Sequence, residues 1–287
     1  MALKLCRLLI CLVEYMKNKL SVIHNLYLKN KYVNESIKLN LKALEDSGTD
    51  YQYILFNDNG DISIREDIEE FLSEKVEYIY SDINYGRKMG TGGWVGALPY
   101  VKGDLIHNTT QDDVMTSLFY KKIIEVFDSR DDIYLVFSNG FKVNENLIII
   151  NLVNNPEFIL NYEQPLEAFK FWFGIDENGE NKVTRSNNNI PAPGTIYRRE
   201  LHDLIGEPGV HEFGGACDFE YWARILFNEY KCHYINFPLW LFRRSKYTTA
   251  LQSKDGKNIG NHWRDLSVEH IKEKYTKLWE ERCNQLI

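Results

Sequence analysis

Short apolar runs alternate with helical patterns through the first third of the chain, and this order constrains the fold more than any other feature. Strands are expected at 20–23, 51–56, 76–80 and 104–106. Apolar residues at helical spacing predict helices at 34–44 and 68–72, and a further helical stretch follows a glycine-rich loop. The order β-α-β-α-β-α-β is typical of a mostly parallel sheet with helices on its faces. We therefore expect an α/β fold with a Rossmann-like, mostly parallel central sheet.

The second half of the chain gives weaker signals. Strands are expected at 133–137, 147–150 and 234–238 and an amphipathic helix at 218–230, whereas 184–194 is a polar loop rich in Asn and Pro. No internal repeat and no clean linker is visible in the sequence. We expect one main domain over 17–251, preceded by an extension over 1–16 and followed by a helical tail over 252–287.

The N-terminal segment is apolar over residues 3–13 but carries Lys4 and Arg7. It is well short of the roughly 20 residues that a membrane-spanning helix needs, and residues 14–17 offer no small-residue cleavage site for a signal peptide. A surface helix, a peripheral membrane anchor and an extension upstream of a start at Met16 remain as interpretations. We favour a poorly integrated extension.

The charge balance and the cysteines bound the partners and the compartment. The 287 residues include 34 Lys and Arg and 41 Asp and Glu, which gives a net charge of −7. No global basic field recruits nucleic acid, so no nucleic-acid partner is expected, and an anionic ligand would need a local site. The five cysteines show no C-x-x-C spacing, which fits free thiols in a reducing compartment. A cytoplasmic protein with at most peripheral membrane contact is expected.

Acidic residues follow two of the predicted parallel strands. Asp58 comes directly after the second strand, and Asp112 and Asp113 follow the fourth. Ligands of such sheets bind at the carboxyl ends of the strands, so these side chains are expected to converge. Carboxylate oxygens suit hard cations such as Mg²⁺ and Mn²⁺, which keep room for substrate phosphates. The pattern predicts a metal–diphosphate site, and an exposed acidic turn is the simpler alternative.

A glycine-rich loop follows the third strand, with glycines at 86, 90, 92, 93 and 96. Its spacing from Gly90 is G-x-G-x-x-x-G rather than G-x-G-x-x-G, and no Walker motif is present. Two interpretations remain open. The loop either packs closely for structural reasons or closes over a diphosphate, with Arg87 and Lys88 supplying positive charge.

Five segments in a characteristic order carry a resemblance to a known family. They are the opening strand and turn at 20–27, the acidic turn at 56–60, the strand from Gly103 to the Asp112–Asp113 pair, the acidic helix start at 217–224 and the closing basic segment at 237–244. Together they resemble glycosyltransferase family 2, of the nucleotide-diphospho-sugar (GT-A) fold. The resemblance covers residues 20–251, with two departures. Thr110 stands where the commonest metal motif, Asp-x-Asp, has its first Asp, and residues 25–28 replace the usual Pro-Thr-Tyr-Asn opening.

The resemblance implies a role for each candidate residue. Tyr27 would stack on the nucleotide base, and Asp58 would accept a hydrogen bond from its N–H, which suits uracil. Asp112 would hold the ribose and Asp113 an Mn²⁺ or Mg²⁺ ion bridging the diphosphate. Asp218 is the candidate general base, because an acceptor hydroxyl attacks well only if a positioned carboxylate takes its proton.

Simpler structural roles stay open for the same residues. Asp58 could form an Asx-turn, Tyr27 could be a core residue and Asp218 could cap its helix. Arg243 and Arg244 could contact phosphate or form a solvated basic turn.

These signals predict an inverting, metal-dependent glycosyltransferase with a nucleotide-sugar donor, UDP favoured, and a glycan, lipid-linked or protein acceptor, in glycan or polysaccharide synthesis. The rival is a non-catalytic nucleotide- or glycan-binding module of the same fold, which Thr110 favours. A sugar-nucleotide nucleotidyltransferase is disfavoured, because residues 24–31 contain no glycine.

Overall fold

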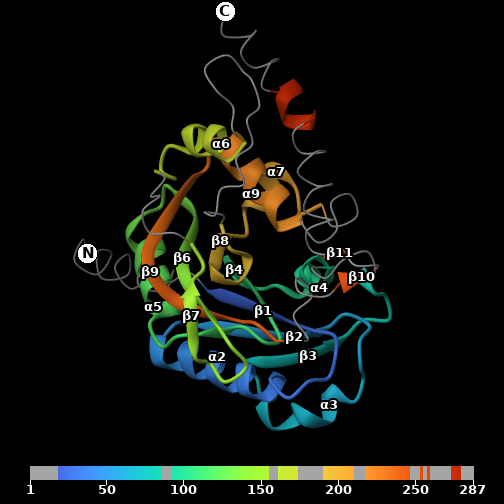
Figure 1. The fold of residues 1–287 in the computed structure, drawn as a ribbon. Helices are drawn as coiled ribbons and strands as arrows, with labels where there is room; N and C mark the ends of the chain where they lie inside the picture. Colours follow the sequence, from blue (N-terminus) through green and yellow to red (C-terminus); the bar gives the residue numbers. More distant parts are fainter. Residues whose placement is uncertain are drawn as a thin grey trace, which may run out of the picture.

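A curled mixed sheet flanked by helices forms the centre of the molecule (Figure 1). The structure is a computed structural model, which describes residues 19–85, 92–154, 161–173, 190–209, 217–245, 253–254, 257–258 and 273–278. Eight of the nine strands run in the order β3-β2-β1-β4-β8-β6-β9-β5, and β7 pairs with β6. The strands are β1 (Leu20–Leu26), β2 (Tyr51–Asn57), β3 (Val76–Tyr80), β4 (Leu105–Thr110), β5 (Val114–Met115), β6 (Ile133–Val143), β7 (Ile149–Leu152), β8 (Thr195–Arg198) and β9 (Lys231–Arg243).

The strands β3, β2, β1 and β4 are parallel, and β1 lies between β2 and β4. The helices α2 (Val33–Ser47), α3 (Ile64–Asp67) and α4 (Gly92–Ala97) connect them. The α/β pattern predicted for this half is confirmed. The helix expected at 68–72 is wrong, because the chain forms the single turn α3 followed by a 3₁₀ turn at Glu69–Phe71. Ile64 and Ile68 both bury their side chains. The helical turn α3 therefore begins four residues before the helix that was expected from Ile68 onward.

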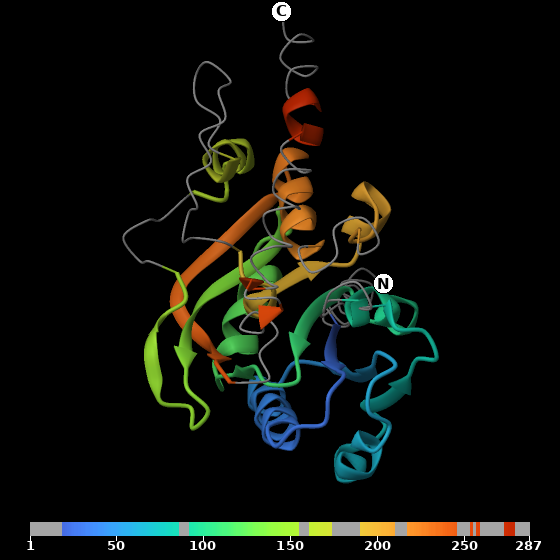
Figure 2. The same ribbon diagram turned by 45° about the vertical axis from the view of Figure 1, so that its right-hand side comes forward.

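Beyond β4 the sheet becomes mixed. β8 is antiparallel to both of its neighbours, β4 and β6, whereas β9 runs parallel to β6. The remaining helices are α5 (Phe119–Ser129), α6 (Pro165–Phe173), α7 (Leu201–Ile205) and α9 (Cys217–Phe227). A small separate pair, β10 (Ser253–Lys254) and β11 (Lys257–Asn258), is antiparallel. Figure 2 shows the long β9 passing behind the β6–β7 hairpin.

The sheet separates two hydrophobic cores, because successive strand residues point to opposite faces. In β1, Val22 belongs to the core beneath α2 and α5, and its neighbour Ile23 belongs to the core beneath α4, α6 and α9. Both side chains are fully buried. Burial on both faces explains why apolar and polar residues do not alternate strictly along this strand.

The helical turn at 273–278 packs onto the core beneath α4, α6 and α9. Its Tyr275 is 2% exposed, contacts the rings of Phe169 and Phe227, and donates a hydrogen bond to Oε1 of Glu220 at 3.2 Å. A helical tail was expected over 252–287, and this turn is the part of it that the structure describes as helical. Within the described ranges, no helix is long and apolar enough to cross a membrane.

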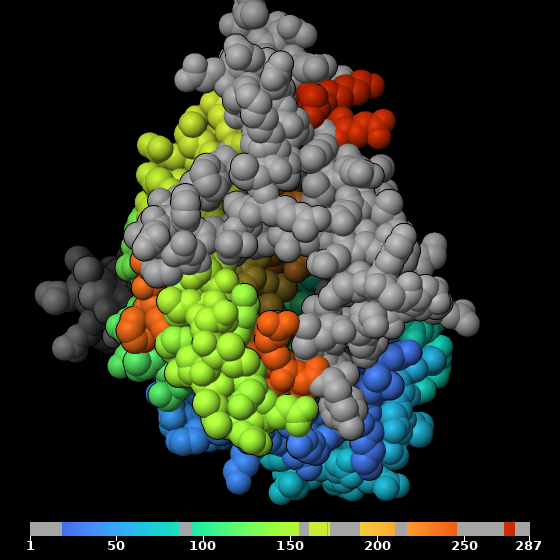
Figure 3. Space-filling view, in the orientation of Figure 1, coloured from blue at the N-terminus to red at the C-terminus, as the bar shows by residue number. Residues whose placement is uncertain are grey.

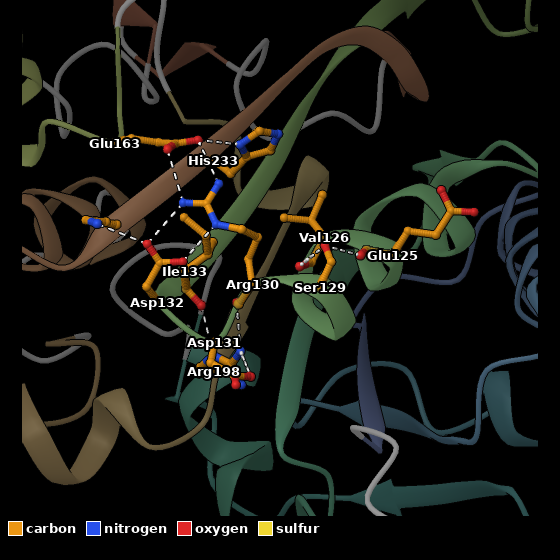
Figure 4. A network of polar contacts seen from close by, with 11 residues as sticks. Glu125, Val126, Ser129, Arg130, Asp131, Asp132, Ile133, Glu163, Arg198 and His233 are labelled. Atoms are coloured by element: carbon orange, nitrogen blue, oxygen red, sulfur yellow. Dashed lines mark hydrogen bonds and ion pairs between the residues drawn. The ribbon is translucent and has the colours of Figure 1, made fainter. Parts of the chain in front are cut away.

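A network of ion pairs fastens the segment before α6 to the starts of β6 and β9 (Figure 4). Arg130 lies between the carboxylates of Asp132 and Glu163, at 2.8 and 3.1 Å. Glu163 also contacts Nδ1 of His233, and Asp132 contacts Lys231, each at 2.9 Å. These side chains are partly exposed, so each pair contributes little alone, and the network acts mainly by joining three segments.

Candidate donor site at the carboxyl edge of the sheet

The candidate site forms where β1, β2 and β4 end side by side. In the parallel ladders, Leu26 of β1 pairs with Asn57 of β2, and Asn25 pairs with Thr110 of β4. The residues that follow these strands must therefore share one edge of the sheet. This edge holds Tyr27, Asp58 and residues 111–113, which are called the carboxylate loop below.

Asp58 is 6% exposed and accepts a hydrogen bond from the backbone N–H of Tyr85 at 2.8 Å. The turn itself is closed by the preceding residue, because the side-chain oxygen of Asn57 accepts from the N–H of Gly60 at 2.8 Å. The N–H of Gly60, which an Asx-turn at Asp58 would use, is thus bound by Asn57. Gly60 is required here, since a Cβ atom would lie 2.0 Å from the carbonyl oxygen of Tyr27.

Tyr27 presents its side chain to solvent, with 47% of the residue exposed. The interpretation of Tyr27 as a core residue is therefore wrong. Its backbone is tied down on both sides, because its N–H donates to Oε1 of Gln111 at 2.9 Å and its carbonyl accepts from the N–H of Asp61 at 2.8 Å. A tyrosine ring on a fixed backbone at the sheet edge suits stacking on a flat ligand.

The carboxylate loop begins after Thr110, the last residue of β4, so the two aspartates lie in the turn rather than on the strand. The hydroxyl of Thr110 lies 3.0 Å from Oδ1 of Asp112 and 2.6 Å from Oδ2 of Asp113. A hydroxyl carries one proton, so it donates to one of these carboxylates at a time. The Thr110 hydroxyl thus lies between the two carboxylates, at the position where the commonest metal motif has an aspartate.

Asp113 is the most deeply buried carboxylate of the site, at 1% exposure. Burial, followed by the negative charge of Asp112, raises its pKa well above the usual range. Burial also raises the pKa of Asp112, opposed by the hydrogen bond from Thr110 and the charge of Arg243. Among the described residues, Oδ1 of Asp113 has no hydrogen-bond partner.

This donor set fits a divalent cation that completes its shell with ligand oxygens. Burial of Asp113 beside the negatively charged Asp112 is costly. The charge of Arg243 offsets part of that cost, and Mn²⁺ or Mg²⁺ would offset more. Within the part of the chain that the structure describes, no group of three or more His, Cys, Asp and Glu side chains could hold a metal. An ion bound by Asp113 would therefore need oxygens from a diphosphate or water.

Arg243, at the end of β9, is 1% exposed. Its Nε donates to the carbonyl of Asp112 at 3.2 Å, Nη1 donates to the carbonyl of Glu145 at 2.8 Å, and Nη2 pairs with Glu35 at 2.6 Å. A solvated basic turn is therefore wrong for Arg243. Figure 3 shows the β6–β7 hairpin beside the end of β9 on one face of the molecule.

Asp218 is the second residue of α9, and its Oδ1 accepts from the N–H of Phe219 at 2.8 Å. This bond reaches the next residue, whereas a cap binds an amide two or three residues on, so the capping interpretation of Asp218 stays open. Asp218 is half-buried, whereas Glu220 is fully buried and paired with Arg224. Of these two acidic residues in the first turn, only Asp218 reaches solvent.

A chain of contacts connects α9 to the sheet edge. Trp222, one turn after Asp218, packs against Trp94 of α4 with ring centroids 5.6 Å apart. The neighbouring Gly93 lies against Asn25 at the end of β1, where a Cβ would come 2.4 Å from Oδ1 of Asn25. Helix α9 therefore packs on the helix that covers the carboxyl edge.

Several candidates fall outside the described residues. These are Arg87 and Lys88 of the glycine-rich loop, the extension over 1–16 and most of the polar loop at 184–194. Conversely, the sequence patterns did not single out the roles of Gln111 and Asn57. The only sequence signal for them is position, because each is an amide residue directly before a predicted acidic site residue. Such a signal is weak.

No family model and no curated protein sequence matches this chain. Solved structures do resemble it. S. aureus TarS 1–349 in complex with UDP-GlcNAc has a TM-score of 0.53 at 13% identity, over 79% of this chain and 59% of that one. A mannosyltransferase from Pyrobaculum calidifontis, PcManGT in complex with GDP-Man and Mn²⁺, has a TM-score of 0.55 at 11% identity, over 81% and 59%.

These neighbours are glycosyltransferases of the GT-A type, so the fold is the GT-A fold that the sequence predicted. The alignments span less than two thirds of the neighbours' lengths. For the longer S. aureus TarS structure the aligned share is 37%, at 17% identity and a TM-score of 0.53.

Proposed function

We propose that the protein is a glycosyltransferase that moves a sugar from a nucleoside-diphosphate sugar to a hydroxyl acceptor. The observation that carries the proposal is the convergence of Tyr27, Asp58 and the two loop carboxylates at the carboxyl edge of three adjacent parallel strands. The GT-A fold supports it, since neighbours of that fold are described in complex with UDP-GlcNAc and with GDP-Man.

Each side chain would contribute one part of donor binding. The exposed ring of Tyr27 stacks on the base, and Asp58 accepts from the base N–H, which favours uracil and hence UDP. Asp112 holds the ribose. Arg87, in the loop after β3, supplies charge to the diphosphate.

Asp113 would hold the Mn²⁺ or Mg²⁺ ion, in agreement with its burial and its unpartnered oxygen. When bound, such an ion stabilises the charge on the leaving diphosphate as a Lewis acid. The protein's part is to fix Asp113 at the edge of the sheet, and the charge of the ion would favour the ionised form that burial opposes.

Asp218 would act as the general base. The acceptor oxygen attacks the anomeric carbon as Asp218 takes its proton, and the bond from that carbon to the diphosphate oxygen breaks. Attack opposite the leaving group inverts the anomeric centre. The acceptor is a glycan, lipid-linked or protein hydroxyl, and we place the reaction in glycan or polysaccharide synthesis in the cytoplasm, with at most peripheral membrane contact.

The decisive experiment measures binding and turnover separately. A thermal-shift screen of UDP-sugars and GDP-Man, with and without Mn²⁺, reports donor binding, because a ligand of the native state raises the unfolding temperature. Release of free UDP or GDP reports turnover. The proposal would be overturned if none of the donors gave a metal-dependent shift in the unfolding temperature.

The rival function is a binding module that has kept the site without turnover, and Thr110 is the observation in its favour. Such a module would show the metal-dependent thermal shift with no release of nucleotide under any acceptor condition. Restoring the acidic residue with Thr110→Asp tests the same point, because turnover gained only in this variant would show that the natural chain binds without reacting.

A further inference from the structure

Helix α2 carries two polar side chains on its buried face. Ser36 and Asn40 lie one turn apart, are both 0% exposed, and flank the apolar Ile37. Burying a hydroxyl or an amide is unfavourable unless it is hydrogen-bonded. Their partners therefore show why polar residues stand where the core would accept apolar ones.

Both side chains hold the carboxylate loop from behind. Ser36 Oγ lies 2.8 Å from the carbonyl of Gln111 and 2.9 Å from that of Val33, so its one proton serves one of these carbonyls at a time. Asn40 Nδ2 donates to the carbonyl of Asp113 at 3.1 Å, and Asn40 Oδ1 accepts from the N–H of Met115 at 2.7 Å. The amide of Asn40 thus brackets the turn from Asp113 into β5.

Arg243 fills the one gap in this series, because its Nε binds the carbonyl of Asp112. The carbonyls of residues 111, 112 and 113 are thus each held by a different side chain. All three bonds go to the backbone. They fix the path of the loop without occupying the carboxylate oxygens that a cation would need.

We propose that Asn40 and Ser36 are positioning residues for the metal carboxylates, with Asn40 the more important of the two. The inference rests on the proposed function for the metal, but the restraint on the loop does not. Groups that orient metal ligands typically account for about 10–100-fold in metal affinity. Asn40 makes one bond to the loop, at Asp113, and one to Met115 of β5, so its loss should release the chain on both sides of Val114.

The chain offers a matched control on the same helix. Asn34 of α2 also donates from its side chain to a backbone carbonyl, that of Asp67 at 3.0 Å, away from the carboxylate loop. Asn34→Ala removes the same chemistry from the same helix. Both variants remove a side-chain amide from α2, but Asn40 is fully buried and Asn34 is only partly buried, so they are compared at residues 111–115 rather than in overall stability.

The first measurement is amide hydrogen exchange resolved along the chain. Asn40→Ala should raise exchange at residues 111–115 while α2 stays protected, and Asn34→Ala should leave 111–115 as in the wild type. The second is the affinity for Mn²⁺ with UDP by calorimetry, which should fall about tenfold or more for Asn40→Ala and stay near the wild-type value for Asn34→Ala.

Unchanged exchange at 111–115 in Asn40→Ala, or an equal change in Asn34→Ala, would overturn the inference. So would faster exchange with wild-type Mn²⁺ affinity, since the loop restraint would then not serve the metal. If Asn40→Ala does not fold, Ser36→Ala removes a single hydroxyl and should show the same local effect on a smaller scale. A wild-type protein that binds no Mn²⁺–UDP would contradict the proposed function, and the exchange data would still decide whether α2 positions the loop.

Discussion

The backbone N–H of Tyr27 donates to the side-chain oxygen of Gln111 at 2.9 Å, across 84 positions of sequence. The other end of the same amide donates to the carbonyl of Leu28 at 2.9 Å. One side chain therefore joins the exposed tyrosine to the carboxylate loop through two hydrogen bonds. The proposed base platform and the proposed diphosphate end of the site form one hydrogen-bonded unit, which is a pre-organised arrangement for a ligand that spans both.

Asp113→Ala should abolish the Mn²⁺-dependent stabilisation by UDP, because it removes the buried carboxylate proposed to hold the ion. At a ligand concentration about 100 times Kd, that stabilisation is about 2.7 kcal/mol in the wild type. Thermal unfolding with and without Mn²⁺ measures it. Asp104→Ala, at the opposite end of β4 and with its side chain 62% exposed, is the control. A variant of Asp113 that keeps the wild-type shift would refute the metal assignment.

UDP should bind more tightly than ADP, because the Asp58 carboxylate suits the ring N–H of uracil and adenine presents no matching donor. Asp58→Asn keeps an oxygen for the N–H of Tyr85 and replaces the other with a donor, so the preference should shrink while the fold persists. Calorimetry with both nucleotides gives the ratio. Equal or tighter binding of ADP by the wild type would exclude this role.

Asp218→Asn should reduce transfer by about 10²–10⁴-fold while donor affinity stays near the wild-type value. The asparagine side chain retains an oxygen for the N–H of Phe219, so the helix start is preserved. Asp203→Asn on α7, which is exposed, controls for a general effect of lost charge. Near-wild-type transfer by Asp218→Asn would leave Asp218 a purely structural role.

Arg243→Lys should destabilise the protein by about 2 kcal/mol or more, because lysine cannot reproduce the planar fork that serves Asp112, Glu145 and Glu35. Urea denaturation measures the free energy of unfolding. The adjacent Arg244 is exposed, so Arg244→Lys should be close to neutral. Equal effects at the two positions would show that the buried contacts contribute little.

Acid should destabilise the fold at a pH where exposed carboxylates remain charged. Burial lowers the pKa of His24 to about 3 and that of His107 to about 4, from an ordinary value of 6.5. The unfolded chain takes up these protons first, so this stability is complete above pH 6.5 and is lost as the pH falls toward 4. Each histidine contributes a slope of about 1.4 kcal/mol per pH unit in that window.

His24→Gln should flatten that slope whatever its effect on absolute stability. Urea denaturation at several pH values between 7.5 and 5 gives the slope directly. An unchanged slope would mean that His24 takes up its proton over the same pH range in the folded and the unfolded chain.

The sequence predicted the half of the sheet from β3 to β4 well, because the local signals there agree with the final sheet except for the helix expected at 68–72. The runs at 51–56 and 76–80 and the helical spacing after Asn34 all became the expected elements. β8 was not predicted. It has only four residues, between a Pro-rich segment and α7, and its place beside β4 is set by antiparallel pairing with β6 that leaves no local pattern.

The convergence of the acidic residues could be predicted from the sequence, whereas the side chains that hold the carboxylate loop in place could not. Asp58 and Asp113 follow strands, and parallel topology brings strand ends together. Arg243 could not be assigned, since its partner Glu35 is 208 positions away. A basic residue near a chain turn reads as solvated unless the fold is known.

The bond from Arg243 to the carbonyl of Asp112 spans 131 positions, and this separation sets an order of assembly. A chain growing on the ribosome exposes β1, β2 and β4, with all of their acidic residues, long before β9 has been synthesised. The middle carbonyl of the carboxylate loop gains its restraint only when β9 has paired with β6. Translation products that stop before residue 243 would carry Asp58, Asp112 and Asp113 but lack this restraint, so the carboxylate loop gains its full set of supports late in biogenesis.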